Sequence, residues 1–259
     1  MAKHKRIWNQ AVHIKYVREG RGSGWGPDYK PWIYVQDFAS RGVVSRVLGK
    51  TTGRVHHLMS NNELAYFYML DWAETVTDIR EQYPLSDLEA ATSIAARAGV
   101  RYPKDNTSGY PYIMTCDFMI TTTSGLKART VKMASELSNA RVLEKLEIER
   151  RYWQMLGIDW KIVTEKEISY RKSKNVEWLY SARDLPMNET LENAAAELLH
   201  TITTAGRSVT EGTGMIETYY YLEPGAGLQL FKHLVLNGLL KIDMNAPINL
   251  NAKGLVVAV

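Results

Sequence analysis

The stretch Ile113–Met133, IMTCDFMITTTSGLKARTVKM, decides the fold that we expect of this chain. Both of its halves are rich in β-branched and other apolar residues, and Ser124-Gly125 between them is typical of a tight turn. We therefore predict a strand over residues 113–121, a two-residue loop at Ser124-Gly125 and a returning strand over residues 126–133.

This predicted register places Asp117 directly opposite Lys132, with Cβ atoms about 4.5–5.5 Å apart. Thr115, Met119 and Thr130 share their face, because side chains alternate along a strand. The other face is apolar and is predicted to be core: Cys116, Phe118, Ile120, Val131 and Met133. A slip of one residue would bury Lys132 among these side chains, so the register is constrained.

Helical and extended patterns surround the hairpin. Ser60 with Glu63 three residues later is the signature of a helix start, and Ser86 with Glu89 repeats it. We expect extended runs over residues 32–38, 43–48, 76–83 and 160–164, a turn over 40–42, and helices from 60, from 86 to 99 and over 139–156. This order predicts an α/β domain over residues 1–168, with a mixed sheet between helices.

The sequence changes character after residue 168. A connector over 165–184 contains a short helical stretch at 176–181, and three further helices are expected over 189–203, 214–222 and 228–237. Short apolar runs over 239–244 and 254–259 then flank Asn245-Ala246-Pro247. Helices followed by a hairpin are the pattern of a winged helix-turn-helix, which we predict for residues 169–259.

Basic residues gather near the N-terminus. Residues 1–60 hold eleven Lys or Arg and three Asp or Glu, a formal charge of +8, whereas the whole chain carries +4. A basic segment on a near-neutral body favours nucleic acid as a partner, and a solvated basic leader is the alternative. The single cysteine, Cys116, and the lack of long apolar runs predict a cytoplasmic protein without a membrane partner.

Glu63, Asp117 and Lys132 form the candidate catalytic set. Carboxylates are oxygen ligands that Mg²⁺ prefers, and a nearby lysine can orient a water and stabilise charge on a phosphate. The Val131 carbonyl is a further candidate metal ligand. The set suits metal-assisted hydrolysis of a phosphodiester. Two other interpretations stay open: Asp117 and Lys132 can form a plain cross-strand ion pair, and Glu63 can serve only its capping box.

Two acids and a lysine in this order resemble the PD-(D/E)xK site of restriction-endonuclease-like nucleases. More of the chain resembles TnsA, the endonuclease family of heteromeric cut-and-paste transposons. The matching stretches are Arg18–Trp32, Thr52–Ala65, Asp78–Leu85, Leu143–Trp153 and Glu177–Ser181. The resemblance implies a restriction-endonuclease-like catalytic domain that uses Mg²⁺, or Mn²⁺ in its place. It places the family's catalytic acids on Glu63 and Asp117, and its lysine on Lys132.

The resemblance also implies a biological role. A TnsA-like protein nicks the 5′ strands at transposon ends in double-stranded DNA, beside a TnsB-like DDE integrase and a TnsC-like AAA+ ATPase. Such a bacterial protein would associate with the nucleoid during transposition. Two alternatives stay open: a resolvase, repair or restriction nuclease, and a catalytically silent DNA-binding adaptor.

Two positions depart from the family pattern. Thr130 stands where the family has Gln or an acid, and Ala73 stands where it has a further acid. The number of metal ions at the site, one or two, therefore stays open. For contact with DNA we predict four side chains: Arg18, Arg21, Arg80 and Gln82. The alternatives are a mobile loop for the first two and a buried charge pair for the segment around Arg80.

Overall fold

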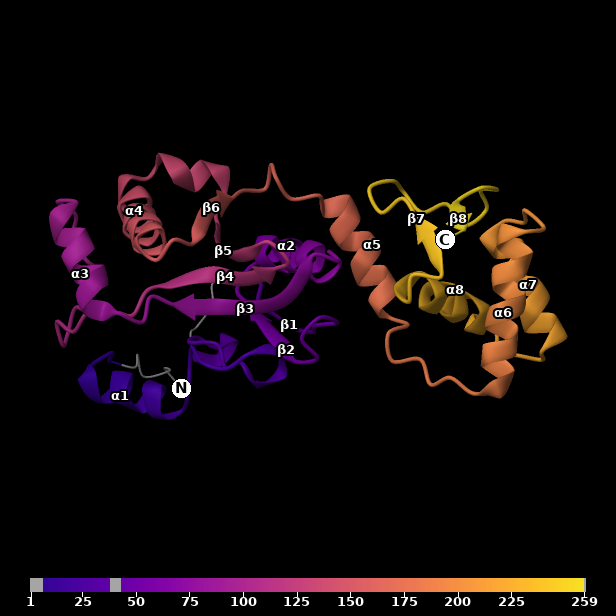
Figure 1. Cartoon of the computed structure of the whole chain (residues 1–259), viewed down its shortest axis with the longest axis horizontal. Helices are drawn as coiled ribbons and strands as arrows, with labels where there is room; N and C mark the ends of the chain where they lie inside the picture. Colours follow the sequence, from indigo (N-terminus) through magenta and orange to yellow (C-terminus); the bar gives the residue numbers. More distant parts are fainter. Residues whose placement is uncertain (1–6, 38–42, 259) are drawn as a thin grey trace. The chain divides into compact units, whose positions relative to one another are not determined.

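Four strands of the N-terminal part form one mixed sheet in the computed structural model of the chain, which describes residues 7–37 and 43–258 (Figure 1). In sheet order they are β3 (Val76–Pro84), β4 (Thr115–Thr122), β5 (Gly125–Val131) and β6 (Asp159–Val163). β3, β4 and β5 are antiparallel neighbours, whereas β6 runs parallel to β5. A parallel neighbour needs a crossover, which α4 (Ala140–Met155) provides. The predicted mixed sheet is confirmed.

The chain divides into two compact units, Met1–Ile168 and Ser169–Val259. The other elements of the first unit, with η for a 3-10 helix, are α1 (Gln10–Arg18), η1 (Gly26–Asp28), η2 (Val35–Asp37), β1 (Ser45–Leu48), β2 (Val55–Leu58), α2 (Asn61–Asp71), α3 (Leu88–Arg97) and η3 (Ala134–Ser138). The predicted turn over 40–42 lies outside the described residues. Within the described ranges, the helices lack the length and apolar composition needed to cross a bilayer.

Both sides of the sheet are covered. Figure 1 shows α4 on one side and the β1–β2 hairpin on the other. α3 and α4 pack together with the strands around a core of Leu85, Ala91, Ile94, Ala95, Met114, Cys116, Met119, Ala128, Ile148, Tyr152 and Trp153. Tyr66 of α2 packs edge-on against Phe118 of β4. Met119, which was expected to share a face with Asp117, is thus a core residue with 1% exposure.

The β4–β5 hairpin turns one residue earlier than predicted, which shifts the cross-strand partner of each residue by two positions. Thr122 pairs with Gly125, so the loop is Thr123-Ser124 and not Ser124-Gly125. Gly125 has a φ of +115° and opens β5, where its carbonyl accepts the Thr122 hydroxyl at 2.9 Å. The left-handed freedom of glycine is therefore used at the strand start and not inside the loop.

The corrected register changes the partner of Asp117. Phe118 pairs with Arg129, so Thr130, and not Lys132, lies directly across from Asp117. A shift of two residues keeps every side chain on its own face, because the strand period is two. Lys132 therefore stays on the side of Asp117, displaced along the strand.

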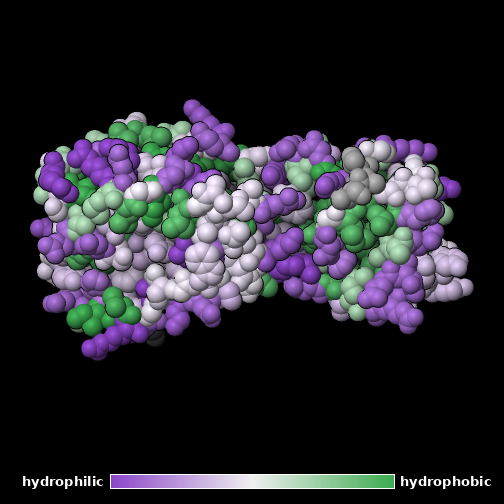
Figure 2. Space-filling view, in the orientation of Figure 1, coloured by the Kyte–Doolittle hydropathy of each residue, from purple (hydrophilic) through white to green (hydrophobic). Residues whose placement is uncertain are grey.

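The N-terminal segment from residue 7 is folded and begins with a helix that the sequence did not predict. α1 starts after Asn9, whose side chain accepts a hydrogen bond from the Val12 N–H at 3.0 Å. A small core forms beneath it from Trp8, Tyr16, Trp32 and Ile113. α1 leaves Ile14 and Val17 43% and 58% exposed, and Figure 2 shows hydrophobic surface at the lower left, where α1 lies in Figure 1.

Side-chain caps explain two further departures from the predicted elements. The expected strand over residues 32–38 is wrong, because Asp37 Oδ2 accepts the Tyr34 N–H at 3.0 Å and closes the turn of η2. α3 is capped by Asp87 instead of Ser86, through a main-chain hydrogen bond of 2.9 Å to the Asp87 carboxylate. Asp and Ser are both good caps, so local sequence does not separate them.

The second unit consists of helices and one short hairpin. Its elements are α5 (Tyr170–Tyr180), α6 (Glu189–Thr203), α7 (Val209–Tyr219), α8 (Ala226–Leu236), β7 (Leu240–Ile242) and β8 (Val256–Ala258). α7 begins earlier than predicted, because Ser208 and Glu211 form a capping box and Gly212 is helical. A Cβ at Gly212 would lie 3.1 Å from Leu198 Cδ1, so this glycine allows close helix packing. The winged-helix assignment stays a prediction.

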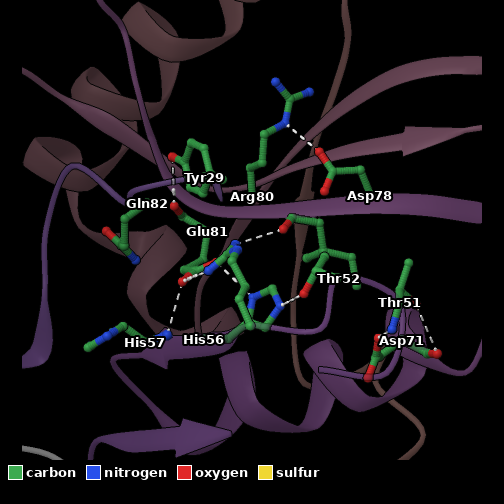
Figure 3. A network of polar contacts seen from close by, with 12 residues as sticks. Tyr29, Thr51, Thr52, His56, His57, Asp71, Asp78, Arg80, Glu81 and Gln82 are labelled. Carbon is green, nitrogen blue, oxygen red and sulfur yellow. Dashed lines mark hydrogen bonds and ion pairs between the residues drawn. The ribbon is translucent and has the colours of Figure 1, made fainter. Parts of the chain in front are cut away.

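A buried charge network ties the β1–β2 hairpin to β3 (Figure 3). Glu81 of β3 has 0% exposure, and its carboxylate accepts two hydrogen bonds from the Arg54 guanidinium, at 2.8 and 2.5 Å. His56 Nδ1 lies 2.8 Å from Glu81 Oε2, and the His57 N–H donates to Oε1 at 3.0 Å. Although burial alone would raise it, His56 and Arg54 hold the pKa of Glu81 below its ordinary value.

We predict that Glu81→Ala lowers the free energy of unfolding by about 3–5 kcal/mol, because it leaves the Arg54 guanidinium buried without its counter-charge. Urea denaturation measures this loss. The matched control is Glu89→Ala at an exposed position of α3, which should cost less than about 1 kcal/mol. Equal losses for the two variants would contradict the role of the network.

Candidate active site

Glu63 lies in the first turn of α2, where the helix cap fixes its side chain. The hydroxyl of Ser60 accepts the Glu63 N–H at 3.1 Å and donates to Glu63 Oε1 at 3.0 Å. Glu63 Oε2 accepts the Met59 N–H at 3.0 Å, one residue before the N–H that a capping box would use. With 6% exposure, the carboxylate is held below the surface at a helix N-terminus.

Asp117 and Lys132 lie close together just beyond Phe118 and Arg129, the last paired residues of β4 and β5. Asp117 Oδ2 accepts the Val131 N–H at 2.7 Å and lies 3.4 Å from Lys132 Nζ. The same ammonium donates to the Val131 carbonyl at 2.8 Å. Its side chain is 29% exposed and that of Asp117 13%. A cationic group therefore lies between two of the predicted metal ligands.

The charges of these side chains act on one another. Burial and then the Asp117 charge raise the pKa of Glu63 to about 7. Asp117 first, and then Glu149 and Glu63, raise the pKa of Lys132 against the effect of burial. The structure thus brings Glu63, Asp117 and Lys132 into one electrostatic group, although their residues come from a helix and two strands.

Glu149 of α4 belongs to the same group, and the sequence reasoning missed it. It is 5% exposed, and its Oε2 accepts the Thr130 hydroxyl at 2.5 Å. Burial raises the pKa of Glu149 to about 7, while the Thr130 hydrogen bond favours the ionised form and the Asp117 charge disfavours it. Trp160 Nε1 lies 3.3 Å from the same hydroxyl. Thr130, across from Asp117, therefore connects the hairpin to a third buried acid.

Burial changes the interpretation of the predicted DNA contacts. Arg80 is 7% exposed and forms an ion pair with Asp78 at 3.1 Å (Figure 3), and Gln82 is 5% exposed. The Arg21 side chain is 10% exposed and donates to Asp37 at 2.5 Å. Of the four predicted residues, Arg18 at the end of α1 is the exposed one. Arg80 pairs with Asp78 of the same strand, and contact of these residues with DNA stays a prediction.

The arrangement offers hard oxygen donors to a cation. Among residues 7–37 and 43–258, no group of three or more His, Cys, Asp or Glu side chains is arranged to hold a metal ion. The available set is instead two carboxylates, those of Glu63 and Asp117, with the Val131 carbonyl beside Asp117. Oxygen donors of this kind, few in number and completed by water, are typical of Mg²⁺ sites.

Two protein families match the chain in sequence. The family described as TnsA-like endonuclease N terminal matches residues 73–165, and the one described as TnsA endonuclease C terminal matches residues 167–244. A curated relative, the transposon Tn7 transposition protein TnsA of Escherichia coli, is 37% identical over 248 residues, which are 94% of this chain and 90% of the relative. The chain belongs to the TnsA family. This membership supports a nuclease role in transposition.

Thr130 stands where the resemblance implied Gln or an acid, and a hydroxyl is a weak metal ligand. Here the hydroxyl is directed to Glu149. The carboxyl group of Glu149 therefore lies close to the hairpin at a point where Thr130 itself offers only a hydroxyl.

We predict that Glu149→Gln makes the stability of the metal-free protein less dependent on pH. A carboxyl whose pKa rises from 4.5 to about 7 on folding favours the folded state when protonated, so its stabilisation is lost as the pH rises from about 4.5 to about 7. Urea midpoints measured with a chelator at pH 5 and pH 8 should differ less for Glu149→Gln than for the wild type. A variant with an unchanged difference would contradict the raised pKa, and Glu89→Gln is the exposed control.

Proposed function

We propose that this TnsA family member is a Mg²⁺-dependent DNA endonuclease that nicks the 5′ strands at transposon ends. The observation that carries the proposal is the pairing of buried Glu63 and Asp117 with Lys132 in one site, in a chain of this family. The relative's printed name describes a transposition protein. A nuclease of this role would act with a TnsB-like DDE integrase and a TnsC-like AAA+ ATPase.

The residues fit a divalent metal. Burial and then repulsion from Asp117 raise the pKa of Glu63 to about 7, and a bound cation would relieve that repulsion. The Lys132 ammonium 2.8 Å from the Val131 carbonyl marks a position that already accommodates positive charge. Glu63, Asp117 and the Val131 carbonyl would hold Mg²⁺, with Mn²⁺ as a substitute. When bound, such a metal acidifies a water and neutralises phosphate charge.

Each side chain has a separate task in this proposal. Lys132, whose pKa the surrounding acids raise, keeps its proton and donates hydrogen bonds to a phosphate oxygen or to the attacking water. Asp117 is oriented by the Val131 N–H, and Glu63 by the cap of α2. These hydrogen bonds fix both carboxylates before DNA arrives, so little reorganisation is needed during the reaction.

The exposed Arg18 and the basic N-terminal segment are the proposed contacts to the phosphate backbone. α1 places Arg18 at its C-terminal end, in a unit whose first 60 residues carry a formal charge of +8. Contacts to phosphates are independent of base sequence and weaken as salt concentration rises. The second unit is the proposed winged helix-turn-helix, with α7, α8 and the β7–β8 hairpin in the order of that motif.

Nicking of a labelled transposon-end duplex tests the proposal, with the cognate integrase and Mg²⁺ present. We predict that Asp117→Asn lowers 5′-strand cleavage by at least about a thousandfold, because a metal ligand and its charge are lost. The control Asp87→Asn keeps the cap of α3, since Asn is as good a cap as Asp, and should cut at the wild-type rate.

The two alternative functions, an autonomous nuclease and a silent adaptor, predict different patterns of DNA cleavage. Cleavage by the wild type without the integrase would favour a resolvase, repair or restriction nuclease. If the integrase processes its own strand while the wild type and Asp117→Asn both leave the 5′ strand intact, the proposed nuclease is ruled out and a silent adaptor is favoured.

A further inference from the structure

Gln82 has an unusual backbone conformation near the C-terminal end of β3, in the sheet that carries Asp117. Its φ is +49°, and among the described residues Tyr221 is the other non-glycine residue with a positive φ. A left-handed residue inside a strand is strained and persists only where its surroundings hold it. Such strain often accompanies a functional position, so the contacts of Gln82 are informative.

The register of β3 and β4 places Gln82 beside the catalytic acids. Glu81 pairs with Phe118 and Tyr83 pairs with Cys116, so Gln82 lies directly across from Asp117. The altered backbone turns its side chain to α2 at this point. The residue therefore stands between the strand that carries Asp117 and the helix that carries Glu63.

Both ends of the Gln82 amide are engaged. Its Nε2 donates to Glu63 Oε2 at 3.4 Å, and its Oε1 accepts the Thr115 hydroxyl at 3.1 Å. The Glu63 carboxylate accepts the amide N–H, which turns the amide nitrogen to Glu63, and the Thr115 hydroxyl, which can donate or accept, donates to the oxygen end. A residue that is 5% exposed and bonded in this way has few other conformations available.

The backbone around Gln82 is anchored from the N-terminal segment. The Tyr29 hydroxyl donates to the Glu81 carbonyl at 3.0 Å, and the Trp32 N–H donates to the Gln82 carbonyl at 3.3 Å. The Glu81 carboxylate is fixed by hydrogen bonds from Arg54 and His56. These bonds come from segments distant in the sequence and hold the strained conformation in place.

We propose that Gln82 is a positioning residue, which holds the Glu63 carboxylate in the orientation needed to share a divalent metal with Asp117. The inference rests on the proposed nuclease function. The amide acts through Glu63 and has no role in the chemical step itself. Groups that orient metal-binding carboxylates typically change metal affinity about 10–100-fold when they are removed.

Direct measurement of Mn²⁺ binding by calorimetry tests the proposal on the full chain without DNA. Gln82→Asn is the main variant, because Asn tolerates the left-handed conformation but its amide is one methylene too short to reach Glu63. We predict that its Mn²⁺ dissociation constant rises about tenfold. Gln154→Asn, at an exposed position of α4, is the matched control and should bind as the wild type does.

A pair of further variants separates positioning from strain. Gln82→Gly and Gln82→Ala both lack the amide, so both should lose Mn²⁺ affinity by the same factor. Alanine is strained at a φ of +49° and glycine is not, so Gln82→Ala should unfold at lower urea than Gln82→Gly. A purely structural Gln82 would instead change stability in the three variants and leave their Mn²⁺ affinity equal to that of the wild type.

Nicking assays on the same proteins distinguish the two proposals. We expect Gln82→Asn to need about tenfold more Mg²⁺ for half-maximal cleavage while its rate at saturating Mg²⁺ stays near that of the wild type. If the wild type binds Mn²⁺ and cuts DNA, and all Gln82 variants bind Mn²⁺ equally well, positioning by Gln82 is overturned and the nuclease function stands. A wild type that neither binds Mn²⁺ nor cuts DNA overturns both.

Discussion

The site depends on one constraint, the electrostatic repulsion between the buried carboxylates of Glu63 and Asp117. Burial and then this repulsion raise the pKa of Glu63 to about 7. Donors surround them on several sides: the Val131 N–H and the Lys132 ammonium at Asp117, and main-chain and amide N–H groups at Glu63. Each donor offsets part of the negative charge, and the remainder is what a divalent cation would neutralise.

Much of the fold could be predicted from local patterns. The start of α2 followed from Ser60 and Glu63, because the Ser60 hydroxyl caps the helix by accepting the N–H three residues later. The mixed sheet followed from the hairpin and from a strand after α4, because a helix between two strands favours a parallel pair. Asp117 and Lys132 were correctly predicted to lie together although the predicted register was wrong by two residues, because a shift of two residues keeps each side chain on its face of the sheet.

The remaining features depend on contacts between distant segments. The sequence around Gln82 predicts an ordinary strand residue. Its left-handed conformation depends on contacts with Trp32 and with the anchored Glu81, and the local sequence does not predict these contacts. α1 was missed because its few apolar residues pack against Trp32 and Ile113 from elsewhere in the chain. Glu149 did have a signal: an acid three residues after Leu146 and four before Trp153 lies on the buried stripe of α4. An acid on such a stripe is costly unless it is paired or functional.

The most direct test of a shared metal at Glu63 and Asp117 is a crystal of the full chain soaked in Mn²⁺, with anomalous scattering used to locate the ion. We expect an anomalous peak within coordination distance of one oxygen of Glu63, one oxygen of Asp117 and the Val131 carbonyl, with the Lys132 ammonium displaced from that carbonyl. A well-ordered site with no peak there, or a peak that Asp117 or Glu63 does not touch, would rule out a metal shared by the two acids.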